Sequence, residues 1–160
     1  MIEIQNYING QLSEPSDKKY LDVFNPSNGK IFSRCPNSTK KDLDAAIVAS
    51  NNSFSDWANL DQSKRSGFLL QIANLIDRDL EKFSKAETTD NGKPYTLSKS
   101  LDIPRSIKNL KFFANMANEI QEESYHQENI VSQIHRHPLG IVGTISPLIP
   151  KTNGGCGTPI

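Results

Sequence analysis

Hydrophobic residues near the start of the chain occur in short groups separated by turn-forming residues, a pattern typical of β-hairpins. Tyr7-Ile8 leads into Asn9-Gly10, and Leu21, Val23, Ile31 and Phe32 flank the turn Pro26-Ser27-Asn28-Gly29. Asparagine and glycine readily adopt the positive φ that tight hairpin turns require. We therefore predict short strands and turns over the first 34 residues, with a hairpin closed by Asn28-Gly29.

From residue 38 the spacing of the apolar positions changes to three and four, which predicts helices. Ser38-Thr39 can cap a first helix, whose apolar residues share one face: Leu43, Ala46, Ile47, Phe54 and Trp57. Asp61 predicts the N-cap of the next helix, with an apolar stripe from Leu69 to Phe83. Asn91-Gly92 predicts a stop, and Pro94 should lie in the first turn of a further helix. That helix should break or kink at Pro104 and continue to Ala117.

The last third of the chain predicts a loop and then two strands. Residues 118–129 are polar and indicate a loop, and the partial alternation from Ile130 to His135 indicates an edge strand. Leu139 to Ile145 is apolar and β-branched, as in a buried strand. A parallel strand needs a crossover and a second strand, and residues 147–160 are rich in proline and glycine. We therefore expect the rest of this sheet to lie beyond the given sequence.

Charge and composition argue against several classes of binding partner. Eighteen basic and eighteen acidic residues cancel, so no overall field favours nucleic acid or an anionic membrane. No apolar run approaches the ~18 residues of a membrane span, and the start of the chain has no signal-peptide pattern. The two cysteines, Cys35 and Cys156, are then expected to be reduced thiols. The expected compartment is the cytoplasm, with neither nucleic acid nor a membrane as partner.

The residues that invite a chemical interpretation are few. Cys156 stands among glycines with no helix to lower its thiol pKa, so we interpret it as an incidental exposed thiol. Cys35 precedes Pro36 and is expected to act as a small buried hydrophobe. His135 and His137 would share one face of a strand. Zinc needs three or four ligands, so a basic strand edge is the preferred interpretation.

Several segments together resemble the aldehyde dehydrogenase superfamily over residues 6–147. They are Asn6-Tyr7-Ile8-Asn9-Gly10, Asn25-Pro26-Ser27-Asn28-Gly29-Lys30, Ala45-Ala46 through Phe54-Ser55-Asp56-Trp57, Glu87-Thr88-Thr89-Asp90-Asn91-Gly92-Lys93-Pro94, Phe112-Phe113-Ala114 and Pro138 through Pro147. Asp102-Ile103-Pro104-Arg105 leans toward the 2-aminomuconic semialdehyde and betaine-aldehyde-like branches. The order and separation of these segments make a chance match implausible.

The resemblance implies an α/β parent fold, of which this chain is an amino-terminal, truncated segment. The chain itself should be mostly α, with an N-terminal β-hairpin, one or two C-terminal strands and an incomplete dinucleotide-binding domain. Residues 1–147 would form the family segment, and residues 148–160 a divergent, disordered tail. In the family the strand ending at Ile145, Ser146 and Pro147 lines the site of NAD or NADP, so these three residues are the expected cofactor positions.

The same resemblance implies that no catalytic residue lies in this chain. In the family the two residues after the position of Pro147 are usually Trp and Asn, and the Asn helps to stabilise the oxyanion; here Leu148 and Ile149 stand in their places, and an aliphatic side chain cannot donate a hydrogen bond to an oxyanion. The nucleophilic cysteine and the general-base glutamate would lie further on, so we expect no turnover and no tight cofactor binding by this chain alone. Asp90 and the backbone of Phe24 match positions that hold a monovalent cation in some members.

Family members associate through strand pairing between subunits, and this suggests a second hypothesis. Residues 130–137 match the region that takes part in that pairing. The chain could therefore be a non-catalytic partner in a homo- or hetero-oligomer with dehydrogenase subunits, bound by β-augmentation.

Overall fold

The N-terminal strands form two hairpins, as the sequence predicts. A computed structural model of the chain describes residues 2–120 and 122–145. Strands β2 (Asn6–Ile8) and β3 (Gln11–Ser13) are joined by Asn9-Gly10, and both turn residues have positive φ. Strand β4 (Tyr20–Asn25) pairs antiparallel with β5 (Lys30–Pro36), with a register shift between Val23 and Phe24. The short β1 (Ile2–Glu3) lies parallel to β5 on its other edge.

Helix α1 (Lys40–Ala58) is fixed to the strand region at its first turn. The backbone N–H of Thr39 donates to a carboxylate oxygen of Asp42 at 2.7 Å, which completes the predicted cap. The other oxygen of Asp42 accepts from the backbone N–H of Ser16 at 2.9 Å and from its hydroxyl at 2.7 Å. Hydrogen bonds from the Thr39 backbone and from Ser16 lower the pKa of Asp42 to about 2. One carboxylate therefore joins α1 to the loop after β3.

The small hydrophobic core lies between two antiparallel helices. Helix α2 (Gln62–Arg78) packs along α5 (Ile103–Asn118), and their buried contact is made by Ala73, Ile76 and Ile107. Between them come α3 (Leu80–Asn91), the single turn α4 (Tyr95–Leu97) and the π-helical segment η1 (Ser98–Asp102). The small residues Ser66 of α2 and Ala114 of α5 are both buried and let the two helices approach closely.

The helix boundaries differ from the predicted ones in three places. The stripe from Leu69 to Phe83 spans two helices, because the backbone leaves α-geometry at Asp79 and Leu80 then turns onto the core. Pro94 is the N-cap of α4 and not a residue of its first turn. At Pro104 the chain stays helical: the proline lies in the first turn of α5, where its missing N–H is tolerated, and the irregularity is the π-helical turn before it.

The predicted loop over residues 118–129 is wrong for five of its residues. Strand β6 (Glu123–Gln127) pairs antiparallel with β7 (Ile130–Ile134), which confirms the predicted edge strand. The turn between them has only two residues, and Glu128 adopts a positive φ of 46°. The polar sequence concealed the strand because both faces of the hairpin are exposed, so neither face needs apolar side chains.

The predicted buried strand at Leu139 to Ile145 is wrong for this structure. The segment forms no strand, and the side chains of Leu139 and Ile145 are 96% and 100% exposed. Its β-branched sequence suits a sheet interior, but within the described residues no strand lies beside it to pair with. The interpretation of His135-Arg136-His137 as part of a strand also fails, since β7 ends at Ile134. The predicted tail, 148–160, lies outside the described residues.

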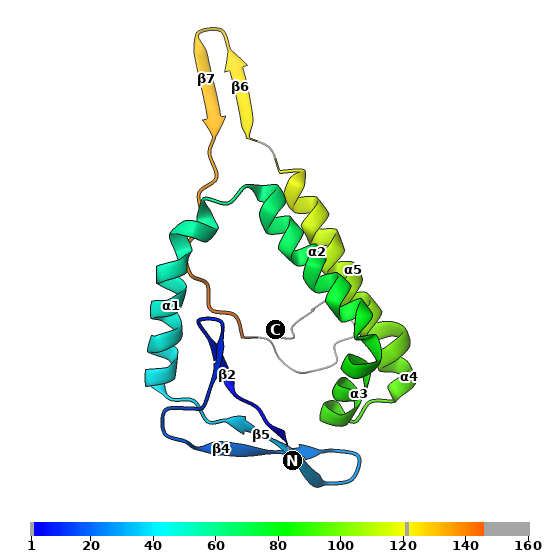
Figure 1. Cartoon of the computed structure of the whole chain (residues 1–160). Coiled ribbons are helices and arrows are strands. Elements are labelled where there is room, and N and C mark those ends of the chain that lie inside the picture. The colour runs from blue at the N-terminus through cyan, green and yellow to red at the C-terminus, as the bar shows by residue number, and fades with distance from the viewer. Residues whose placement is uncertain (1, 121, 146–160) are drawn as a thin grey trace.

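The elements are arranged in an open frame and do not pack into a single layered core (Figure 1). Helix α1 stands on one side, the α2–α5 pair on the other, the β4–β5 hairpin at one end, and the β6–β7 hairpin extends away at the opposite end. The predicted class is confirmed: a mostly helical chain with an N-terminal hairpin and C-terminal strands. Among the described residues, no helix is both long and apolar enough to cross a bilayer.

Candidate functional site

The end of α3 and the β4–β5 turn approach each other closely, and this contact joins two of the segments that carry the family resemblance, residues 25–30 and 87–94. Gly92 ends α3 in a left-handed conformation with φ of 76°, and its N–H donates to the Thr88 carbonyl at 2.9 Å. A Cβ at this position would lie 2.8 Å from Cγ of Pro26 in the hairpin turn. Glycine is therefore required here both for its backbone conformation and for the approach of the hairpin.

Lys93, a lysine whose side chain is largely enclosed, organises the same region. The ammonium of Lys93 donates to Glu87 at 2.8 Å and to Asp102 at 2.7 Å, and its side chain is only 11% exposed. Burial works to lower the pKa of Lys93, but the hydrogen bonds that its ammonium donates to Asp102 and Glu87 outweigh this effect, and the net shift is upward. Because Glu87 lies in α3 and Asp102 in η1, this cation joins the two segments.

Asn91 completes the cluster. Its amide nitrogen donates to the Glu87 carboxylate at 2.7 Å, and its amide oxygen accepts from the backbone N–H of Lys93 at 3.0 Å. The second bond holds the chain through the turn after Gly92. Within the segment Glu87 to Pro94, the side chains of Glu87, Asn91 and Lys93 thus hold one another and the turn in place.

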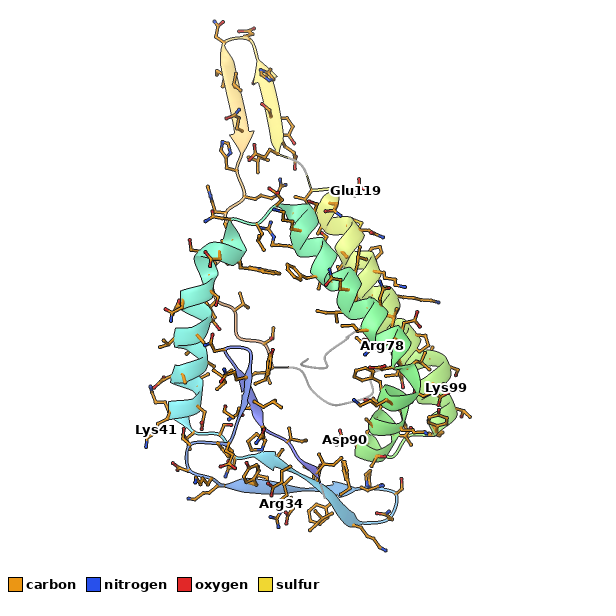
Figure 2. All side chains as sticks on the ribbon, viewed as in Figure 1. Arg34, Lys41, Arg78, Asp90, Lys99 and Glu119 are labelled. Carbon is orange, nitrogen blue, oxygen red and sulfur yellow. The ribbon has the colours of Figure 1, made fainter. Side chains whose placement is uncertain are left out.

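Asp90, the predicted cation ligand, lies at the end of α3 nearest the β4–β5 hairpin (Figure 2). Its side chain is half-buried, and burial together with the neighbouring Glu87 carboxylate raises its pKa. Phe24, the other predicted ligand, lies in β4, which contacts α3. Within the described part of the chain no group of three or more His, Cys, Asp or Glu side chains could hold a metal ion. A cation held by one carboxylate and backbone oxygens is a different arrangement, so this site stays a prediction.

The predicted cofactor positions lie largely outside the region that the structure describes. Ser146 and Pro147 are outside the described residues, and Ile145 is fully exposed at their edge. A nicotinamide site needs a concave surface around the ring. The described residues form no such surface around Ile145, so they do not by themselves fit the dinucleotide.

The other residues singled out in the sequence do not form a site together. Cys35 is a half-buried free thiol in β5, less enclosed than predicted, and Cys156 lies outside the described residues. His135 has one ring nitrogen 3.7 Å from Glu122. Beside the β6–β7 hairpin, an open depression of about 430 Å³ is lined by Glu119, Ile120, Glu123 and Arg136. Its Arg136 and Glu123 pair with each other at 2.7 Å, which leaves it no concentrated charge.

The sequence did not predict two of the polar connections that hold this fold together. Lys93 reaches Asp102 nine positions later, and Ser16 reaches Asp42 across 26 positions. Only the capping pattern around Thr39 gave a local signal, and it identified Asp42 as a residue of the first turn without its distant partner. Contacts at such separations depend on how the elements pack together, and they produce no periodic pattern in the sequence.

Comparison with known sequences gives consistent matches. A family model described as the aldehyde dehydrogenase family matches residues 13–148. A 2-aminomuconic semialdehyde dehydrogenase of Homo sapiens is 34% identical over 149 residues, which are 92% of this chain and 30% of that protein. A long-chain-aldehyde dehydrogenase of Acinetobacter sp. is 35% identical over 147 residues, 91% of this chain and 29% of that protein. The chain therefore spans about 30% of the length of these relatives.

Comparison with solved structures agrees. An aldehyde dehydrogenase from Bacillus cereus, solved as an NAD+ complex, matches 81% of this chain and 27% of its own, with a TM-score of 0.76 and 25% identity. An indole-3-acetaldehyde dehydrogenase of P. syringae matches 88% of this chain and 29% of its own, with a TM-score of 0.82. At 22% identity, this second match supports the fold alone.

Proposed function

The chain belongs to the aldehyde dehydrogenase family, and we propose that it forms an amino-terminal segment of an enzyme that oxidises an aldehyde to a carboxylic acid with NAD+ or NADP+. The observation that carries this proposal is the family match over residues 13–148, in a chain that spans about 30% of its relatives. The cofactor class follows the family, which includes a relative solved with NAD+. When bound, the dinucleotide would accept a hydride from the substrate.

The role proposed for this chain is structural support of the enzyme and not the chemistry itself. The Gly92–Lys93 cluster fixes α3 against the hairpin and η1, and Ile145, Ser146 and Pro147 are the proposed contributors to the cofactor site. Because the described residues do not enclose Ile145, we propose that the chain alone neither binds the dinucleotide tightly nor turns over an aldehyde.

A turnover assay tests this proposal directly. The purified chain is incubated with NAD+ or NADP+ and a panel of aldehydes that includes a semialdehyde of the muconic type, since several relatives carry 2-aminomuconic semialdehyde dehydrogenase in their names. We expect no reduced cofactor above the buffer rate, while the human relative in the same assay produces it. Turnover by the chain alone would contradict the proposal that its role is supporting.

A second candidate function rests on the β6–β7 hairpin. Every residue of both strands is exposed, and within the described residues neither outer edge is paired. An isolated two-stranded hairpin is only marginally stable in water, and an unpaired edge is a template for another strand. We propose that the hairpin pairs with a strand of a dehydrogenase subunit, so that the chain acts as a non-catalytic partner in a homo- or hetero-oligomer.

The strand register identifies which residues to substitute in a test of this second function. Gln127 and Ile130 flank the two-residue turn and exchange hydrogen bonds, so the backbone N–H of Gln133 points to the outer edge of β7. Gln133→Pro should therefore block an added strand and keep the hairpin, whereas Ser132→Pro should break the hairpin itself. After co-expression with a tagged full-length dehydrogenase, we expect the wild-type chain to co-purify and Gln133→Pro to be lost. Equal recovery of wild type and Gln133→Pro would exclude pairing through this edge.

The compartment proposed for the chain is the cytoplasm. Fractionation of cells that express it with a C-terminal tag, beside a known cytoplasmic marker, tests this placement. Recovery with an organelle or envelope fraction would contradict it.

A further inference from the structure

Three asparagine–glycine steps lie within the described residues, and the backbone surrounds each of them differently: Asn9-Gly10, Asn28-Gly29 and Asn91-Gly92. In such a step the backbone nitrogen of the glycine can attack the side-chain amide of the asparagine, because glycine has no side chain to hinder the approach. The reaction requires a glycine N–H that can lose its proton and an asparagine side chain that can turn toward it. A further step, Asn153-Gly154, lies outside the described residues.

At Asn91-Gly92 both reacting groups are already engaged. The backbone N–H of Gly92 donates to the carbonyl of Thr88 at 2.9 Å. The amide nitrogen of Asn91 donates to Glu87 at 2.7 Å, and its amide oxygen accepts from the backbone N–H of Lys93 at 3.0 Å. A hydrogen bond made by the neutral N–H opposes its ionisation, and the two side-chain bonds keep the Asn91 amide from turning. The fold therefore protects this step.

The step Asn28-Gly29, in the β4–β5 turn, is protected in a similar way. The backbone N–H of Gly29 donates to the carbonyl of Asn25 at 2.8 Å. The amide oxygen of Asn28 accepts from the backbone N–H of Lys30 at 2.9 Å. This turn also closes a ladder of six paired positions, so freeing the two groups requires the opening of a long hairpin.

At Asn9-Gly10 neither reacting group is engaged. Both residues are exposed, and within the described part of the chain neither the Asn9 amide nor the Gly10 N–H has a hydrogen-bond partner. Their φ angles of 53° and 75° are those of a type I′ turn. The turn closes only three pairs of residues, and Tyr7 and Leu12 of the ladder are 70% and 68% exposed. So short and exposed a ladder opens at little cost, which lets the Asn9 side chain reach the Gly10 nitrogen.

We propose that Asn9 is a site of spontaneous deamidation in the folded chain, whereas Asn28 and Asn91 are preserved. The Gly10 nitrogen forms a bond to Cγ of Asn9, and the bond from Cγ to Nδ2 breaks. The amide nitrogen leaves as ammonia, with the proton that the Gly10 N–H gives up. Water then opens the cyclic succinimide at either carbonyl, which yields aspartate or isoaspartate. Both products add a negative charge, and isoaspartate also routes the main chain through the β-carbon and so lengthens the turn.

The hairpin is held at both of its ends, so conversion at its turn should leave the rest of the chain folded. The hydroxyl of Ser38 donates to the side-chain oxygen of Asn6 at 2.9 Å, at the start of β2. The loop after β3 is fixed by the bonds from Ser16 to Asp42. Figure 1 shows that the turn after β2 points away from the β4–β5 hairpin. The modification is therefore confined to one exposed turn.

Peptide mapping tests the proposal residue by residue. The full chain of 160 residues is kept at mildly alkaline pH in buffer made with heavy-oxygen water, and samples are digested with trypsin over time. Asn9, Asn28 and Asn91 fall in different tryptic peptides, and electron-transfer fragmentation distinguishes aspartate from isoaspartate. We expect Asn9 to convert at least about tenfold faster than the other two, a factor that corresponds to about 1.4 kcal/mol in the cost of opening. Each product should carry one heavy oxygen from the solvent.

Unfolding in urea supplies the matched control, because all three steps then lose the hydrogen bonds that distinguish them. The lead of Asn9 should vanish in urea. Asn9→Gln, whose longer side chain would have to form a larger ring, should stop the conversion at this position and leave the rates at Asn28 and Asn91 unchanged. Conversion of Asn28 or Asn91 in buffer as fast as that of Asn9 would overturn the proposal. So would a lead of Asn9 that persists in urea, since its origin would then be the local sequence and not the fold.

Discussion

At the scale of single residues, two glycines give a matched test of the contact between α3 and the hairpin. Gly92 has φ of 76° and little room beside Pro26, whereas Gly67 lies inside α2 with no atom within 4 Å of an added Cβ. Gly92→Ala should lower the free energy of unfolding by about 1–3 kcal/mol, and Gly67→Ala should raise it by about 0.5–1 kcal/mol. Chemical denaturation of the two variants measures both values. Equal effects of the two substitutions would show that the close approach of Pro26 is absent in solution.

Asp90 gives a test of the predicted monovalent cation. Burial and Glu87 raise its pKa above the ordinary value of 3.8, so the folded state binds the proton more tightly than the unfolded state does. Stability from this group is therefore present at acidic pH and is lost as the pH rises through the raised pKa. At neutral pH the ionised carboxylate destabilises the fold unless a cation accompanies it.

We predict that the salt determines which protein, the wild type or Asp90→Asn, gains thermal stability. In tetramethylammonium buffer at neutral pH, Asp90→Asn should melt at a higher temperature than the wild-type chain. Potassium or sodium at equal ionic strength should raise the melting temperature of the wild type and leave Asp90→Asn unchanged. Asp77→Asn, which removes an exposed carboxylate of α2, serves as the control. A wild-type chain that melts alike in all three salts would contradict the cation prediction.

At the scale of elements, Lys93 decides how α3 meets η1. Lys93→Met keeps the length of the side chain and leaves Glu87 and Asp102, both partly buried, without their shared cation. The cost should be about 1–3 kcal/mol of unfolding free energy, because each carboxylate loses a charged hydrogen bond. Lys108→Met, at an exposed lysine of α5, should change stability by no more than about 0.5 kcal/mol. Thermal melts of the pair measure the difference, and a loss shared by both variants would contradict a specific role for Lys93.

The elements that sequence reasoning predicted are those whose signal is local. The Asn-Gly turns, the Thr39 cap and the helical spacing of α1 each reside within a few residues, and each is confirmed. The failures have a different origin. Strand β6 has no apolar face because it buries none, and the segment from Leu139 to Ile145 has a strand sequence without a strand beside it. The site showed the same division, since Asp90 and Gly92 stand in a local motif and the partner of Lys93 does not.

At the scale of the whole molecule, stability is divided between parts that contact each other weakly. The buried apolar contact lies between α2 and α5, whereas α1 is held by polar bonds at its two ends, from Ser16 to Asp42 and from Arg65 to the Ala58 carbonyl, and by the pairing of Trp57 with Phe68. Cooperative unfolding requires that the parts share enough buried surface to lose it together. The arrangement therefore predicts that α1 separates before the helix pair unfolds.

Urea unfolding followed by two probes checks this prediction. Trp57 is the only tryptophan, so its fluorescence reports the contact of α1 with α2, and far-ultraviolet circular dichroism reports helix content as a whole. We expect the fluorescence transition at a lower urea concentration than the dichroism transition. In the dichroism transition, the unfolding free energy should fall by only about 1 kcal/mol per molar urea, at the low end for small proteins. The reason is that unfolding exposes little additional apolar surface. Coincident transitions with a steep slope would contradict this prediction, because they would mean that the parts of the chain unfold as one unit.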